Sequence, residues 1–193
     1  MRIVITMRPI TMKAIVVGAA TLGAIALIGA NPGSDEPLNQ GKKAPAFSAL
    51  GTDGKTHTLD SHLKEGMTFM YFIKEGCPVN HQAAPHVQKL AAAYKEKSNL
   101  VGVYNGSAAD AKSWLKRYKS SYVLIEDPAL KVIRSYGAEY SPWMVAVNKD
   151  GTIHRVFEGA SPRELDEVNK LMAKNSGEKL AAISFAGAPT GGG

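Results

Sequence analysis

Residues 68–94 read TFMYFIKEGCPVNHQAAPHVQKLAAAY. The apolar run at residues 69–73 is rich in aromatic side chains and predicts a buried strand. After a turn at residues 74–76, Cys77 and Pro78 lead into apolar residues at helical spacing, namely Val87, Leu90, Ala91 and Tyr94. The only cysteine of the chain therefore lies where a buried strand gives way to a helix.

This position favours sulfur chemistry at Cys77. The unpaired N–H groups and the dipole of a helix N-terminus stabilise a thiolate over a thiol. Pro78 suits the first helical turn, where an N–H would be unpaired in any case. Lys74, three residues before the cysteine, adds a positive charge to the predicted site. We therefore interpret Cys77 as a reactive thiol, and the alternative is an inert small hydrophobic residue.

The first thirty residues have the composition of a targeting segment. Three basic residues precede the apolar residues 14–28, and no acidic residue occurs before Asp35. This pattern predicts a signal peptide at residues 1–30, with an uncleaved N-terminal anchor as the alternative. On either interpretation the rest of the chain is exported, to the periplasm or another extracytoplasmic compartment.

Charge and cysteine content exclude two classes of protein. Without residues 1–30, the net charge falls from +6 to (23 − 3) − 17 = +3. No basic stripe with interleaved aromatic residues occurs, so the sequence does not predict nucleic-acid binding. One cysteine in an exported chain excludes an internal disulfide framework, and the thiol is left to react or to pair with another molecule.

The remaining chain predicts one α/β domain. We expect a linker at residues 31–40, a domain at 41–174 and a flexible C-terminal tail at 175–193. Predicted strands and helices alternate as in a parallel sheet, with a terminal helix beginning at Ser161. The strands are expected at residues 100–104, 122–125, 143–148 and 152–157, and the helices at 108–118, 128–136 and from 161 onward. Residues 59–65 are expected to form a short connector.

Several local features together resemble the thioredoxin-like redoxin family. They are the Asp53-Gly54 hairpin, Cys77-Pro78, a proline eight residues after the cysteine, Pro142 before an apolar strand, and a final Asp-Gly turn. The hairpin resembles the branch that holds exported thiol-disulfide oxidoreductases and AhpC/TSA-like peroxiredoxins. The resemblance implies a thioredoxin-like fold, with a central mixed β-sheet flanked by helices and an N-terminal β-hairpin. It also implies that Pro142 is a cis-proline that faces the cysteine and positions the backbone of a substrate.

The sequence departs from the family at residues that matter for chemistry. The Cys-x-x-Cys motif reads Cys77-Pro78-Val79-Asn80, so an intramolecular disulfide cannot close, although Asn80 could hydrogen-bond near the sulfur. Tyr71 occupies the place of a buried acidic residue that moves protons in the family. Peroxiredoxins carry a hydroxyl side chain three residues before the cysteine, where this chain has Lys74.

Other chemistry-bearing residues give weaker signals. Cys77 and His81 are four residues apart, a spacing that suits Cu(I) or Zn, but a third ligand such as His154 has nothing to place it nearby. We therefore expect His81 and His86 to face solvent, and we predict neither a metal nor a cofactor. Glu75 and Asp127 are interpreted as surface and turn residues.

The sequence as a whole predicts an exported oxidoreductase with one active cysteine. Its expected site consists of Cys77, Pro142, Lys74 and Asn80. Its expected partners are proteins with thiols or disulfides, together with a small or protein thiol that resolves the mixed disulfide. A one-cysteine peroxidase, a metal-handling protein and a non-catalytic binding module are the alternatives.

Overall fold

The computed structural model describes residues 38–138 and 140–190, so the predicted signal peptide and most of the linker lie outside the described residues. The domain is built on a five-stranded sheet in the order β5-β4-β3-β6-β7. Its strands are β3 (Thr68–Ile73), β4 (Leu100–Tyr104), β5 (Val123–Glu126), β6 (Trp143–Val147) and β7 (Ile153–Phe157). β3, β4 and β5 are parallel, whereas β6 and β7 are antiparallel to their neighbours. The sheet is mixed, as predicted.

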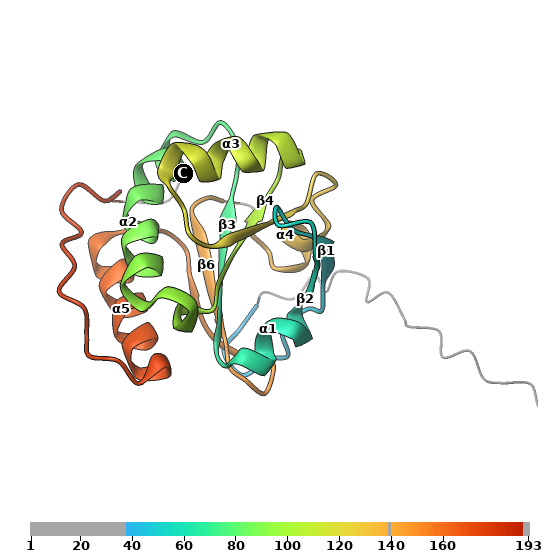
Figure 1. Cartoon of the computed structure of the whole chain (residues 1–193). Helices are drawn as coiled ribbons and strands as arrows, with labels where there is room; N and C mark the ends of the chain where they lie inside the picture. The colour runs from blue at the N-terminus through green and yellow to red at the C-terminus, as the bar shows by residue number, and fades with distance from the viewer. Residues whose placement is uncertain (1–37, 139, 191–193) are drawn as a thin grey trace, which may run out of the picture. The chain divides into compact units, whose positions relative to one another are not determined.

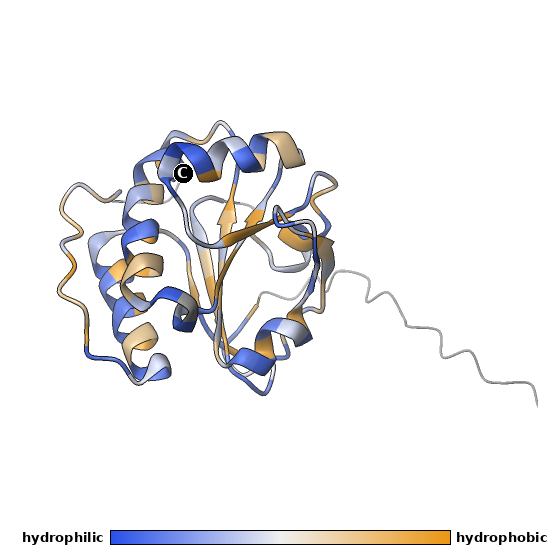
Figure 2. Cartoon of the chain, viewed as in Figure 1, coloured by the Kyte–Doolittle hydropathy of each residue, from blue (hydrophilic) through white to orange (hydrophobic). Residues whose placement is uncertain are grey.

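The central strand β3 is buried along its whole length, and its side chains divide the core in two. Phe69, Tyr71 and Ile73 face one apolar cluster, which is closed by α2 (Pro78–Tyr94), α3 (Ala108–Tyr118) and α5 (Pro162–Ser176). Met70 and Phe72 face the other, which is closed by α1 (Leu59–Glu65) and α4 (Lys131–Ser135). Figure 1 shows these layers, and Figure 2 shows the hydrophobic strands between helices whose outer faces are hydrophilic.

Side-chain caps fix where the longer helices begin. The side chains of Ser107 and Ser161 each accept a hydrogen bond from the backbone N–H three residues further on. The carboxylates of Asp110 and Glu164 in turn accept from the backbone N–H of Ser107 and Ser161. Such reciprocal caps satisfy N–H groups that have no partner within the helix. The predicted cap at Ser161 is confirmed. α1 begins in the same way at Thr58, so residues 59–65 form a helix where we had expected a connector.

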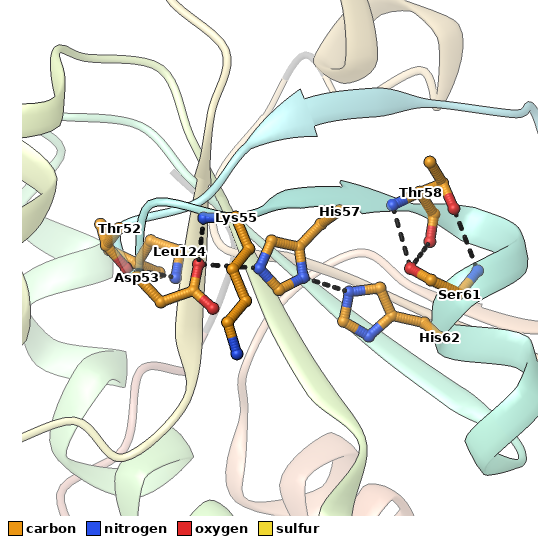
Figure 3. Close-up of polar contacts among 8 residues, drawn as sticks. All are labelled: Thr52, Asp53, Lys55, His57, Thr58, Ser61, His62 and Leu124. Carbon is orange, nitrogen blue, oxygen red and sulfur yellow. Dashed lines mark hydrogen bonds and ion pairs between the residues drawn. The ribbon is translucent and has the colours of Figure 1, made fainter.

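The N-terminal hairpin, β1 (Ser48–Leu50) and β2 (Thr56–Thr58), forms a separate two-stranded sheet. A chain of side chains ties it to α1 (Figure 3): Asp53 Oδ1 lies 2.9 Å from His57 Nε2, and His57 Nδ1 lies 3.2 Å from His62 Nε2. His62 Nδ1 continues the chain to Asn99 Oδ1 at 3.3 Å. Burial lowers the pKa of His62. We call Asp53, His57, His62 and Asn99 the histidine relay.

The described part of the predicted tail, residues 175–190, packs against the domain. α5 continues to Ser176, and residues 178–190 run along α2 and α5 without forming a strand. Phe185 is buried in the core cluster beside α2, and Lys89 Nζ donates to the Ser184 carbonyl at 3.1 Å. Tyr94 holds the start of the segment, since its hydroxyl accepts from Ala181 N at 3.1 Å. The packing of this segment was not predictable from the sequence, because most of its residues are small and each buries little apolar area.

Candidate active site

Cys77 is the N-cap residue of α2, at the C-terminal end of β3. Its carbonyl accepts from the backbone N–H groups of Asn80 and His81 at 3.1 and 3.3 Å, and its own N–H donates to the Lys74 carbonyl at 3.2 Å. The side chain is half-buried. The Sγ atom donates to the carbonyl oxygen of Ser141 at 3.5 Å, so the thiol faces the loop that precedes β6.

That loop carries Pro142 in a cis peptide bond with Ser141, and both residues are buried. The Ser141 hydroxyl is a hub for the turn between β3 and α2. Its Oγ accepts from Lys74 N at 3.2 Å and from the Asn80 side-chain amide, and it donates to the Phe72 carbonyl at 3.2 Å. One hydroxyl therefore joins the cis-proline loop, the end of β3 and the first turn of α2.

Asn80 fills the position of the missing second cysteine and is fully buried. Its amide nitrogen donates to Ser141 Oγ and, at 3.3 Å, to the Lys74 carbonyl. Its Oδ1 accepts from the Tyr71 hydroxyl at 3.0 Å. Every polar atom of the Asn80 side chain therefore has a partner, as a buried amide requires. We call Tyr71, Asn80 and Ser141 the buried polar network.

The buried polar network explains why two departures from the family occur together. Tyr71 replaces the family's buried acid, and Asn80 replaces its second thiol. Here the two side chains bond to each other. Burial raises the pKa of Tyr71 well above 10, so its hydroxyl stays a neutral donor and does not serve as a base near neutral pH. Sequence reasoning noted both positions but missed Ser141, because a serine before a proline gives no signal of its own.

Lys74 is the remaining predicted site residue. The exposed Lys74 joins the site through its backbone N–H and carbonyl. Trp143, the first residue of β6, is half-buried, and Tyr140 is 64% exposed at the edge of the cis-proline loop.

The histidines and Asp127 differ from expectation. His86 is buried and packs against Phe185 at 6.2 Å between ring centroids, so it does not face solvent. His81 is half-buried against the rings of Trp114 and Tyr118. Asp127 is buried and accepts from Lys131 N and Ile133 N at 2.7 and 2.8 Å, which fixes α4.

No group of three or more His, Cys, Asp or Glu side chains within residues 38–138 and 140–190 could hold a metal ion. In the same part of the chain, no helix is long and apolar enough to cross a membrane.

An apolar cavity of about 190 Å³ borders the thiol's loop. It lies between the end of β3, α4 and Ser141, and Lys74 and Arg134 also line it. Among the residues that the structure describes, no acidic residue lines this cavity. Its apolar residues are Phe72, Ile73, Leu130, Ile133 and Ala138.

A cysteine that caps a helix beside a cis-proline loop, on a mixed sheet covered by helices on both faces, defines a protein of the thioredoxin-like fold. A family model confirms this class at the level of sequence, since the AhpC/TSA family model matches residues 40–156. The chain belongs to the AhpC/TSA family.

Relatives and solved structures agree with this assignment. The thiol-disulfide oxidoreductase ResA of Bacillus thuringiensis subsp. konkukian is 25% identical over 132 residues, which cover 67% of this chain and 76% of the relative. ResA of Halalkalibacterium halodurans is 26% identical over 129 residues, 66% of this chain and 73% of the relative. A putative thiol:disulfide interchange protein DsbE from Chlorobium tepidum superposes with a TM-score of 0.63 at 22% identity, covering 71% of this chain and 97% of that one. This last likeness supports the fold alone.

Proposed function

We propose that this protein is an exported thiol-disulfide oxidoreductase that works through Cys77 alone. Its similarity to the ResA proteins supports the reaction class. The observation that carries the single-cysteine form is the site itself: the thiol stands 3.5 Å from the carbonyl of the cis-proline loop, and a fully bonded asparagine occupies the second-cysteine position. The basic and apolar leader at residues 1–30 supports export.

The reaction proceeds in three exchanges. The Cys77 thiolate attacks one sulfur of a partner's disulfide, forming an Sγ–S bond, and the partner's other sulfur leaves as a thiolate that takes up a proton. An outside thiolate then breaks the mixed disulfide and releases the reduced partner. A second molecule of that thiol regenerates Cys77, so two outside thiols become one disulfide for each partner disulfide reduced.

The loop and the apolar cavity would hold the partner. An extended segment can pair its backbone with the loop at Pro142, which places its sulfur near Sγ. The cavity beside Ser141 would then accept an apolar side chain of that segment. Because Lys74 and Arg134 are the charged residues among the described lining, a partner segment with an acidic residue beside its cysteine is favoured.

The experiment separates this function from its peroxidase alternative. Protein comprising residues 31–193 is mixed with a disulfide-bonded test protein and a small thiol, and reduction of the test protein is followed. Reduction that disappears in Cys77→Ser supports the proposal. Consumption of hydrogen peroxide by the same protein, without reduction of the test protein, would instead establish the peroxidase.

A further inference from the structure

A second cavity, of about 470 Å³, lies on the other side of the Cys77 turn from the cis-proline loop. The turn contributes Glu75 and Gly76 to its lining, and α2 contributes His81. The rest of the lining comes from β4 and α3 and consists of Tyr104, Asp110, Ser113, Trp114 and Arg117. In the sheet, β4 and β6 lie on opposite sides of β3. The cis-proline loop leads into β6, and the cavity is lined by Tyr104 of β4 and by Gly76 and His81 on either side of Cys77 in the sequence, so the loop and the cavity flank the Cys77 turn from opposite sides. We call the cavity the α3 cavity.

The α3 cavity is lined by charged side chains of both signs. The carboxylate of Glu75 and the guanidinium of Arg117 line it, and neither makes a hydrogen bond or ion pair with any residue of the described part of the chain. Asp110 also lines it, but its carboxylate is occupied by Ser107 in the cap of α3. The free charges therefore offer one site for an ammonium group and one for a carboxylate.

Rings and one imidazole make up much of the rest of the lining. Tyr104 and Trp114 are buried, with ring centroids 5.9 Å apart, and His81 lies 5.0 Å from Trp114. His81 Nδ1 is bonded to the Tyr118 hydroxyl, which fixes the ring. With Nδ1–H donating to that hydroxyl oxygen, Nε2 is the nitrogen that accepts a proton. Imidazole is the side chain best suited to accept a proton from a thiol near neutral pH.

The proposed function requires a thiol from outside, since Cys77 is the only cysteine. In thiol–disulfide exchange the attacking sulfur approaches opposite the leaving sulfur. A partner bound along the cis-proline loop places the leaving sulfur on the β6 side of Sγ. The attack therefore comes from the β4 side, the side of Gly76 and His81, which line the α3 cavity.

We propose that the α3 cavity binds the resolving thiol and that this thiol is a small zwitterion with an amino-acid head group. Its ammonium pairs with Glu75 and its carboxylate with Arg117. His81 accepts the thiol proton, the new thiolate bonds to Cys77 Sγ, and the partner sulfur leaves as a thiolate that receives the proton from His81. This inference rests on the proposed function.

The test isolates the second exchange. Cys77 is converted to a mixed disulfide with 5-thio-2-nitrobenzoate, and release of the coloured thiolate is measured with cysteine, glutathione, 2-mercaptoethanol, cysteamine and thioglycolate. Each rate is divided by the rate of the same thiol with a cysteine–nitrobenzoate disulfide free in solution. We expect saturation with cysteine and glutathione, and corrected efficiencies about a hundredfold above that of 2-mercaptoethanol, because two charge-assisted contacts each contribute about tenfold.

Variants assign the effect to the cavity. Glu75→Gln and Arg117→Gln should each lower the efficiency with cysteine about tenfold and leave that with 2-mercaptoethanol unchanged. Lys116→Gln removes the same charge from the neighbouring position of α3. It should leave the efficiencies with cysteine and with 2-mercaptoethanol unchanged. His81→Gln should slow the reaction near neutral pH and shift its pH profile toward that of the thiol alone.

The outcomes separate the two proposals. If all five thiols react linearly and in proportion to their intrinsic reactivity, or if Lys116→Gln matches Arg117→Gln, the α3 cavity does not bind the resolving thiol, while the proposed function stands. If Cys77 forms no mixed disulfide at all, the proposed function fails and this inference fails with it.

Discussion

The two sides of the Cys77 sulfur are built differently. On the β6 side, the buried polar network leaves no polar atom of the Asn80 side chain without a partner and holds the cis-proline loop against the end of β3. On the β4 side, Glu75 and Arg117 line an open cavity, and their charges have no partner in the described residues. One side is closed by hydrogen bonds that stabilise the fold, and the other keeps polar groups that can bind a ligand.

This difference shows how a redoxin can lose its second thiol and keep its site. A buried cysteine at position 80 would bond weakly with its surroundings, whereas an amide forms three strong hydrogen bonds there. The substitution turns a redox position into a support for the loop that faces the thiol. In a Cys-x-x-Cys protein the second thiol resolves the mixed disulfide. Here a thiol from outside the chain must perform that step.

The largest effect is expected from Asn80→Ala. Removing the amide leaves the Tyr71 hydroxyl, the Lys74 carbonyl and part of the Ser141 hydroxyl unsatisfied in a site closed to water. We expect a loss of about 2–4 kcal/mol in the free energy of unfolding, measured by urea denaturation. Gln82→Ala, which removes an exposed amide from the same helix, should cost less than about 1 kcal/mol. Equal losses for the two variants would mean that the network does not stabilise the closed side.

A smaller loss is expected from Tyr71→Phe. The variant keeps the buried ring and removes the donor to Asn80, so about 1–1.5 kcal/mol should be lost. Tyr122→Phe is the matched control, because its ring packs edge-on against Tyr71 at 6.5 Å but its hydroxyl lies outside the network. The rate of Cys77 alkylation should change in Tyr71→Phe and stay at the parent value in Tyr122→Phe. A change of the same size in both would argue for packing as the cause.

The stability that the buried polar network contributes should not depend on pH in the acid range, whereas the stability from the histidine relay should. Burial lowers the pKa of His62 below its usual 6.5, so the unfolded chain binds more protons just below that pH. The stability from His62 is therefore complete above pH ~6.5 and is lost as the pH falls. Tyr71 contributes no such change, because its pKa is raised above 10.

Denaturation at a series of pH values checks this contrast. His62→Gln should flatten the decline between neutral pH and pH ~5, and Tyr71→Phe should leave its slope unchanged. His154→Gln, a substitution on β7, serves as the control. A decline that persists unchanged in His62→Gln would place the acid-sensitive group elsewhere.

The smallest effect on stability is expected on the open side. Arg117→Gln removes an exposed charge without a partner in the described residues, so the free energy of unfolding should stay within about 0.5 kcal/mol of the parent value. A loss of 2 kcal/mol would show that Arg117 supports the fold, and its part in ligand binding would need another explanation.

Periodicity and turn chemistry predicted most of the fold. The alternation of apolar runs gave the five strands of the sheet, and Ser161 gave the start of α5, because these signals are local in sequence. The docked tail could not be predicted in this way. Leu180, Ile183 and Phe185 are spaced among small residues, and the burial of Phe185 depends on the core cluster that residues of α2 and α5 form.

The candidate site was predictable only in part. Cys77 and Pro142 follow from local patterns and from the family resemblance. The bond between Tyr71 and Asn80 joins residues nine apart, on a strand and a helix, and the Ser141 hub is about sixty residues further on. His86 was expected to face solvent, and its burial depends on the tail. Contacts of this kind follow from packing, which no periodicity encodes.

The central claim is that Cys77 carries the reaction through a mixed disulfide that only an outside thiol resolves. Mass spectrometry of the protein mixed with a disulfide-bonded peptide, first without and then with cysteine, measures this directly. Without cysteine, we predict one covalent adduct per chain at Cys77 that persists. With cysteine, the adduct should disappear as free reduced peptide forms. Peptide reduction by Cys77→Ser, or an adduct that resolves with no thiol added, would contradict the account.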